Sequence, residues 1–323
     1  MLEQVKRHWK ILQTLHRVDS ERRAYSIGGV DDPTHVDGGE ATFVSLWRDA
    51  VGVSQAEVKT SGLAYVFGRT SKLFCLYDDY CDNYDQSTPP SFESIKKNPV
   101  LKAEVHTLIQ TIKQSPIEDF QKREMLRMLN RERYRLATLQ MEHGYSADPL
   151  PSEVALEWRE RGGGYVTSMF MKIGNLHHNI PFEKAHEVED AAYWFGANFQ
   201  LFDDIIDIGS DLADSRQSAF RSVLWEKRDE WANVTDYLSD AKTLRVPSTT
   251  ISKLAPQTFD RLQEERRKYH KKIPSTSNYE LMKFYADPDT FFDMAFWFER
   301  CFAIRVRENL SLLKIAFNLI KNQ

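Results

Sequence analysis

Acidic side chains gather at two places in the chain, at a spacing that suits metal binding. Residues 73–85 read LFCLYDDYCDNYD and residues 199–211 read FQLFDDIIDIGSD, so each stretch contains an Asp-Asp-x-x-Asp motif. On a helix, the first and last aspartates of the motif lie one turn apart on one face, where like charges repel each other. A divalent cation removes that repulsion, and magnesium commonly binds through one or two carboxylates together with substrate phosphates. The motifs therefore indicate sites for a divalent cation such as magnesium.

The first motif consists of Asp78, Asp79 and Asp82 and follows an apolar stretch. Phe67 and Phe74 lie upstream on the same helical face as Asp78, so an aromatic stripe ends in carboxylates. A solvated, acidic helix end is the structural alternative. A helix that looks buried and leads directly into carboxylates is not typical of a protein surface, and this favours the metal interpretation.

The second motif consists of Asp203, Asp204 and Asp207, and Asp211 follows one turn later. Asp203, Asp207 and Asp211 recur every four residues, so they share one face of an expected helix. Several isoleucines lie between them, which predicts a central helix, and acids in such a helix are rarely there for packing. If the two acidic helices face each other, their carboxylates converge on one cavity mouth. Only bound cations make that arrangement favourable.

The spacing of apolar residues predicts helices along the whole chain, because strand-like alternation is scarce. Glycine (14) and proline (12) are also sparse. We expect irregular structure after residue 211, and helices at about 58–84, 116–144, 152–174, 182–210 and 290–320. No repeat or linker divides the sequence. The predicted fold is all-α, with residues 1–323 forming a single domain built as one large helical bundle.

The composition excludes several classes of function. The 323-residue chain has 43 basic and 47 acidic residues, a net charge of −4, which argues against nucleic acid as a partner. Its three cysteines form no CxxC pair, so neither a disulfide framework nor a zinc site is expected. No uncharged run reaches the ~18 residues of a membrane span, and the N-terminus does not read as a signal peptide. We therefore expect a cytoplasmic protein without an integral membrane segment, and a homodimer is left open.

The paired motifs DDYCD and DDIIDIGSD on an all-α bundle resemble those of the class I terpene synthases and the wider isoprenoid synthase superfamily. The resemblance implies a helical bundle of the terpenoid synthase type. It also implies three Mg²⁺ ions that hold the diphosphate of a prenyl diphosphate substrate, which ionises to an allylic carbocation. By this resemblance the first motif, Asp78, Asp79 and Asp82, ligates magnesium. The ligands of the third ion are left open between Asp203/Asp207/Asp211 and Asp203/Asp204/Asp207.

A third feature supports the resemblance. Residues 158–165 read WRERGGGY, and in terpene synthases an arginine that senses diphosphate precedes a helix break whose carbonyl approaches the substrate. The resemblance assigns these roles to Arg159 and Gly163, with Arg161 as the alternative sensor. A simple helix kink or close helix packing is the structural alternative for the glycines.

Further substrate contacts are implied less directly. Arg300 is a candidate diphosphate donor, with Arg266, Arg267 and Tyr269 as alternatives. A carbocation needs a dry pocket, and aromatic faces attract cations. The candidates for that lining are Phe67, Phe74, Tyr165, Phe170 and Phe199, for each of which plain core packing is the alternative.

Three functions remain open. The leading hypothesis is a terpene synthase, a lyase that cyclises or rearranges one prenyl diphosphate and releases diphosphate. The alternative is a trans-prenyl diphosphate synthase or another prenyltransferase. Chain-elongating enzymes of that kind carry an early Gly-Lys-x-x-Arg segment, which residues 1–60 lack. The third hypothesis is a non-catalytic helical protein that retains the fold, or a di-iron bundle, although the paired Glu-x-x-His motifs of such bundles are missing.

Overall fold

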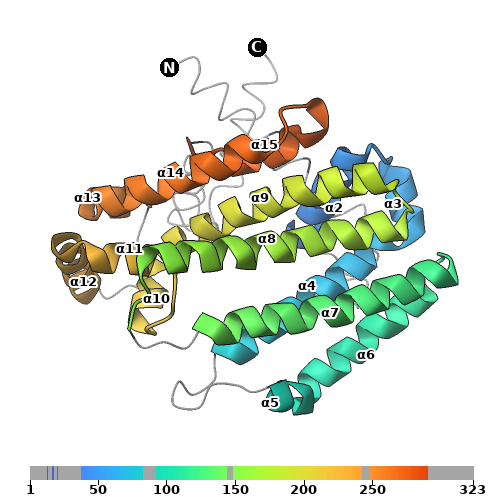
Figure 1. Ribbon diagram of the computed structural model, residues 1–323, viewed down its shortest axis with the longest axis horizontal. Helices are drawn as coiled ribbons and strands as arrows, with labels where there is room; N and C mark the ends of the chain where they lie inside the picture. The colour runs from blue at the N-terminus through green and yellow to red at the C-terminus, as the bar shows by residue number, and fades with distance from the viewer. Residues whose placement is uncertain are drawn as a thin grey trace, which may run out of the picture.

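The computed structural model describes residues 38–82, 92–143, 148–241 and 248–289, together with positions 13, 17 and 20. In this part of the chain the regular elements are all helical (Figure 1). None of the described helices is long and apolar enough to cross a membrane. Their bounds are α2 Gly38–Val51, α3 Gln55–Ser61, α4 Leu63–Asp82, α5 Phe92–Lys97, α6 Pro99–Gln114, α7 Asp119–His143, α8 Ser152–His177, α9 Phe182–Ile206, α10 Ile208–Ala213, α11 Ala219–Glu226, α12 Arg228–Ala241, α13 Ser248–Leu254, α14 Pro256–Lys272, the short 3₁₀ helix η1 Ser277–Tyr279 and α15 Glu280–Ala286.

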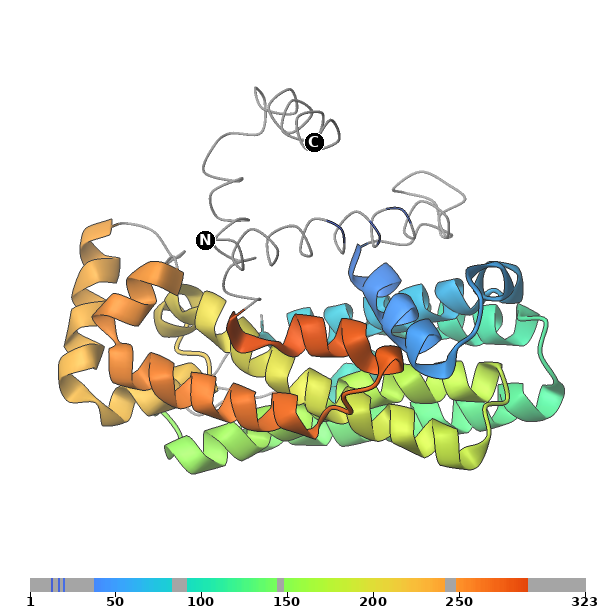
Figure 2. The same ribbon diagram turned by 90° about the horizontal axis from the view of Figure 1, so that it is seen from above.

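Two long antiparallel helices, α8 and α9, form the centre of the structure and lie side by side in both views (Figures 1 and 2). Helix α7 packs along α8, and α14 packs along α9. Helix α4 contacts α2, α6 and α8, while α11 fits against α8, α9 and α14. The prediction of an all-α fold is confirmed.

The core explains why the helices assemble in this way. The largest cluster of buried apolar side chains draws on helices from α2 to α15 and contains Trp47, Phe67 and Phe170, all with 2% exposure or less. The Phe170 ring stacks on Phe43 with centroids 4.6 Å apart and meets the edge of Phe67 at 5.5 Å. Burying an aromatic side chain of this size contributes about 2–3 kcal/mol. A second cluster, around Phe220, draws on the helices from α9 to α14.

Two predicted helix boundaries differ from the structure. The helix expected at 58–84 is divided at Gly62, whose φ of 76° gives α3 a left-handed C-cap that an L-residue rarely adopts. The helix expected at 182–210 stops at Ile206, because Asp207 leaves helical geometry with φ −95° and ψ 5°.

Most of the described residues after 211 are helical, so the expectation of irregular structure is wrong for residues 219–241 and 248–286. Side-chain contacts cap the start of two of these helices: the Ser218 hydroxyl accepts the Arg221 amide of α11, and the buried Glu230 carboxylate accepts the Gln257 and Thr258 amides of α14. Such caps stabilise a helix start by about 1 kcal/mol each. The helix expected at 290–320 lies outside the described residues.

Glycine allows the two central helices to touch at the backbone. A Cβ on Gly163 of α8 would lie 2.3 Å from the carbonyl oxygen of Gly196 in α9, and a Cβ on Gly196 would lie 2.2 Å from the oxygen of Gly163. Neither distance is tolerable for a real side chain, so both positions require glycine at this helix separation. The neighbouring Gly162 faces α7, where the nearest atom to an added Cβ belongs to Leu139 at 3.9 Å.

These distances predict opposite effects for adjacent substitutions. Gly163→Ala should lower the free energy of unfolding by about 1–3 kcal/mol, because it pushes two backbones apart. Gly162→Ala should be neutral or raise it by up to about 1 kcal/mol, because alanine favours a helix more than glycine does. Urea denaturation followed by circular dichroism measures both. Equal destabilisation by the two variants would contradict the backbone contact.

Two adjacent histidines, one buried and one half-buried, lie at the carboxyl end of α8. His177 is 3% exposed, its Nδ1 lies 3.3 Å from Nδ1 of His178, and the His178 ring lies 4.7 Å from the ring of Trp47. Both Nε2 atoms are buried without a hydrogen-bond partner among the described residues. Burial lowers the pKa of His177 to about 3 and also lowers the pKa of His178.

This pair should make the fold acid-sensitive. In the folded protein the pKa values of both histidines lie below the unfolded value of about 6.5. Their contribution to the free energy of unfolding is therefore fully present above pH 6.5 and is lost as the pH falls. For His177 we expect a loss of about 1–2 kcal/mol between pH 7 and pH 5, since one pKa unit is about 1.4 kcal/mol. His177→Gln should flatten the pH dependence of the unfolding free energy. His106→Gln, at an exposed position, serves as the control, and the same slope in both variants would disprove the assignment.

Candidate active site

The two aspartate motifs occupy the carboxyl-terminal ends of α4 and α9. Both helices run in the same direction through the bundle, so both ends lie toward the end of the bundle that also carries α10 and α11 (Figures 1 and 2). The backbone of Asp78, Asp79 and Asp82 forms the last turns of α4. Their side chains lie outside the described residues, as does Arg300.

The aspartates of the second motif have different surroundings although they are close in sequence. Asp207 is exposed, Asp203 is half-buried, Asp204 is fully buried and Asp211 is 8% exposed. The difference follows from the end of α9 at Ile206, after which α10 takes a new direction (Figure 1). The common face expected for Asp203, Asp207 and Asp211 is therefore not formed.

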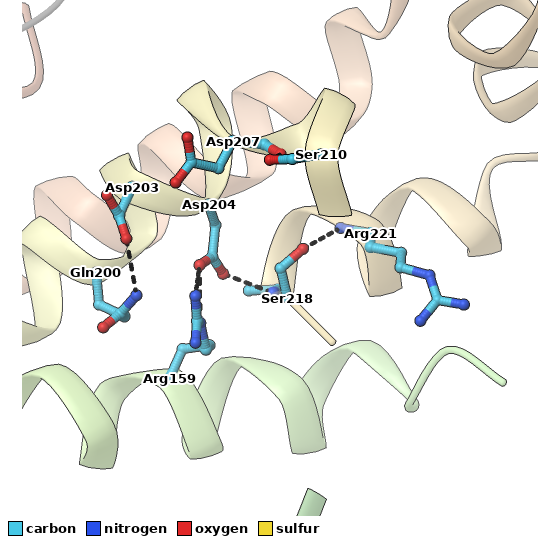
Figure 3. A network of polar contacts seen from close by, with 9 residues as sticks. Arg159, Gln200, Asp203, Asp204, Asp207, Ser210, Ser218 and Arg221 are labelled. Atoms are coloured by element: carbon cyan, nitrogen blue, oxygen red, sulfur yellow. Dashed lines mark hydrogen bonds and ion pairs between the residues drawn. The ribbon is translucent and has the colours of Figure 1, made fainter. Parts of the chain in front are cut away.

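Asp203 and Asp207 are the aspartates of this motif with access to solvent. Gln200 Nε2 approaches a carboxylate oxygen of Asp203 at 3.5 Å (Figure 3). Within the described residues, no three His, Cys, Asp or Glu side chains are placed to hold a metal ion together. Carboxylate oxygens are nevertheless the donors that Mg²⁺ prefers, and it often needs only one or two of them beside substrate phosphates. Asp203 and Asp207 fit that requirement.

Asp204 is held by protein groups. One of its oxygens accepts Arg159 Nε at 2.7 Å and also the Arg159 Nη2 group, and the other accepts the Ala219 amide at 2.6 Å (Figure 3). Arg159 comes from α8, and Ala219 is the first residue of α11, where the helix dipole favours a negative charge. Asp204 therefore joins α8, α9 and α11.

Asp211 lies in the same buried network. Burial raises the pKa of Asp211 to about 8, and the neighbouring Asp204 charge adds to this effect. The Arg159 charge and a hydrogen bond with the Ser218 side chain oppose it. The pKa of Arg159 responds to the same groups: burial acts to lower it, but the charges of Asp204, Asp211 and Asp203 raise it above its ordinary value.

The Arg159 and Gly163 segment has no helix break. Helix α8 continues without interruption from Ser152 to His177, and the expectation of a break at the glycines is wrong. The Gly163 carbonyl accepts a hydrogen bond from Thr167 Oγ1 at 3.0 Å, and Gly163 itself packs against Gly196. Close helix packing, the structural alternative, accounts for this glycine.

The other predicted cations are spread over the bundle. Arg161 is half-buried on α8, and Arg267 is exposed on α14 with Nη2 4.0 Å from Asp289. Arg266 is fully buried: its Nε and Nη2 donate to Asn198 Oδ1 at 3.2 and 3.1 Å. Burial lowers the pKa of Arg266 to about 9, which leaves the side chain cationic at neutral pH.

The predicted aromatic lining divides between core and surface. Phe67 is fully buried against Phe170, and Phe74 is half-buried against the same cluster. Phe199 is 41% exposed on α9, and its ring lies 6.1 Å from the rings of Phe195 and Phe202. The contacts of Phe67 are those of a core residue, and a role for Phe74 or Phe199 toward substrate stays a prediction.

Comparison with solved structures identifies the architecture. The chain is similar to geranylgeranyl pyrophosphate synthetase from Pyrococcus horikoshii Ot3, with a TM-score of 0.54 and 16% identity over 76% of this chain and 83% of that one. It is also similar to polyprenyl synthase from Caulobacter crescentus CB15, crystallised with calcium and isoprenyl diphosphate, with a TM-score of 0.54 and 14% identity over 88% and 97%. A geranylgeranyl pyrophosphate synthetase from the archaeon Geoglobus acetivorans gives a TM-score of 0.53 and 16% identity over 85% and 88%.

The chain has the all-α isoprenoid synthase fold. No protein-family model matches the sequence, and no curated protein matches it. At 14–16% identity the solved structures establish the isoprenoid synthase fold and not an activity. The resemblance drawn from the sequence is thus confirmed at the level of the fold.

Two parts of the polar network were not expected from the sequence. The Ala219 amide is a backbone donor, so no side-chain pattern marks it as a partner of Asp204. The Arg266 side chain of α14 is hydrogen-bonded to Asn198 of α9, and these two residues are 68 positions apart in sequence. The N-cap residue Ser218 is the one local signal, since serine is favoured at helix starts.

The different surroundings of the aspartates predict different costs of removal. Asp204→Asn should lower the free energy of unfolding by about 2–4 kcal/mol, because it leaves the largely buried Arg159 cation without its counter-charge. Asp207→Asn, at an exposed position of the same helix end, should change it by no more than about 0.5 kcal/mol. Thermal and urea denaturation would show the difference, and similar losses for both variants would argue against the buried pair.

Proposed function

We propose that this protein is a magnesium-dependent prenyltransferase that ionises an allylic prenyl diphosphate and joins the prenyl group to an acceptor. The observation that carries the proposal is the placement of two aspartate motifs at the same end of an isoprenoid synthase fold. The similar structures bear the names of prenyl diphosphate synthases, and one of them was obtained with a divalent cation and isoprenyl diphosphate. This supports prenyl transfer over the cyclase that the sequence placed first.

The chemistry follows from the charge that develops when the substrate ionises. Breaking the allylic C–O bond leaves a diphosphate anion, and Mg²⁺ bound by carboxylates supplies the positive charge that stabilises it. Asp203 at the end of α9 and Asp207, the residue that follows α9, would hold the cation together with Asp78, Asp79 and Asp82 from α4. The carboxylates of Asp203 and Asp207 have the solvent access that such binding requires.

The cyclase remains a second candidate because one sequence observation favours it. Residues 1–60 contain no Gly-Lys-x-x-Arg segment to hold a second diphosphate. A terpene synthase needs no second substrate. A transferase without that segment would use an acceptor that carries no diphosphate, or would bind it elsewhere.

Diphosphate release separates these activities. With Mg²⁺ and C10, C15 or C20 prenyl diphosphates, a chain-elongating transferase should release diphosphate only with isopentenyl diphosphate and form a product one C5 unit longer in mass spectrometry. Release without a second substrate, with a hydrocarbon or alcohol product, would instead identify a cyclase. Removal of Mg²⁺ with a chelator should abolish either reaction.

The metal assignment is tested by removing one aspartate from each motif. Asp82→Ala and Asp207→Ala should each lower turnover about 100-fold or more, because each removes a ligand of the cation that stabilises the leaving group. The helical circular dichroism should stay unchanged. Unaltered turnover in either variant would remove that motif from the metal site.

A further inference from the structure

The buried Asp204–Arg159 pair has a role that the two residue types alone do not reveal. Both residues were expected at the reaction centre, Asp204 as a metal ligand and Arg159 as a diphosphate sensor. In the structure, the oxygens of Asp204 face Arg159 and the Ala219 amide (Figure 3). Asp204 is 0% exposed, and the Arg159 side chain is 20% exposed.

The position of the pair along α9 matters as much as its burial. Asp204 lies one residue after Asp203 and three before Asp207, in the last turn before α9 ends at Ile206. The final carbonyls of a helix lack intrahelical partners, so a terminal turn frays unless other contacts hold it. Asp204 supplies such contacts in two directions, to α8 and to the start of α11.

From this geometry we propose that Asp204 and Arg159 are positioning residues that fix the rotation of the last turn of α9, so that Asp203 and Asp207 project together toward the cation. The inference rests on the proposed function and deepens it. The Asp204 carboxylate is committed to the protein, and the Arg159 guanidinium holds it there with two donors on one oxygen. Arg159 also compensates one of the three negative charges of the motif, which lowers the repulsion within it.

Arginine suits this role better than lysine does. Its guanidinium presents several donors in a fixed plane, whereas a lysine ammonium is a flexible point charge. In the described network, Nε and Nη2 of Arg159 both reach the same carboxylate oxygen. Arg159→Lys should therefore keep the positive charge but hold the Asp204 carboxylate in a less defined orientation.

The test compares Asp204→Asn, Arg159→Met, their double variant and Arg159→Lys with Asp207→Asn. Diphosphate release from the prenyl substrate, with isopentenyl diphosphate present as the acceptor, is measured against Mg²⁺ concentration and against substrate concentration, below the melting temperature of each variant. Glu157→Gln, an exposed position on α8, is the control for substitution on that helix and should match the wild type.

A positioning role predicts one pattern. Asp204→Asn and Arg159→Met should each lower kcat about 10- to 100-fold, while KM and the half-saturating Mg²⁺ concentration change by less than about twofold. The double variant should be no slower than the slower single variant, because both changes break the same contact. Arg159→Lys should recover part of kcat. Asp207→Asn, in contrast, should raise the half-saturating Mg²⁺ concentration about tenfold or more.

Other patterns would overturn the inference. If Asp204→Asn raised the half-saturating Mg²⁺ concentration as Asp207→Asn does, Asp204 would be a metal ligand. If Arg159→Met raised KM while Asp204→Asn did not, Arg159 would bind the diphosphate. If the fold loss of kcat in the double variant equalled the product of the two single losses, Asp204 and Arg159 would have independent roles. A wild-type protein that releases no diphosphate refutes the proposed function itself, whereas an active wild type with any of these patterns refutes the positioning role alone.

Discussion

The close approach of α8 and α9 is the constraint on which the remaining geometry depends. Gly163 and Gly196 bring the two backbones into contact, and no other residue fits at either position without separating the helices. Arg159 lies one turn before Gly163, so the same contact brings its guanidinium within reach of Asp204 on the facing helix. Further along the seam, Asn175 Nδ2 donates to the Ala185 carbonyl and to Glu189.

Burial then divides the aspartates of residues 203–211 into two groups. Asp204 and Asp211 are withdrawn into a buried network where an arginine, a helix N-terminus and a serine hydroxyl compensate their burial. Asp203 and Asp207 keep access to solvent. A buried charge is tolerated only with partners, whereas an exposed carboxylate can exchange water for a cation. Asp204 and Asp211 therefore contact other protein groups, whereas Asp203 and Asp207 have the solvent access that a metal ligand requires.

The comparisons place this chain in an architecture used for prenyl diphosphate chemistry. A shared fold at 14–16% identity does not establish a shared activity, since one fold supports many functions. At the end of α9, the carboxylates of Asp203 and Asp207 supply oxygen donors of the hard type that Mg²⁺ prefers.

The sequence by itself determined the fold class and the two stretches that carry chemistry, because helical periodicity and the four-residue spacing of aspartates are local properties. It also showed that Arg159 and Gly163 lie four residues apart, which is one helical turn. The tertiary structure decided what those residues contact: that Gly163 serves a helix crossing, that α9 stops at Ile206, and that Asp204 faces Arg159 and Ala219. Identical aspartates four or eight residues apart look equivalent in sequence. Their burial depends on where the helix ends and which neighbours pack against it, and both are set by residues far along the chain.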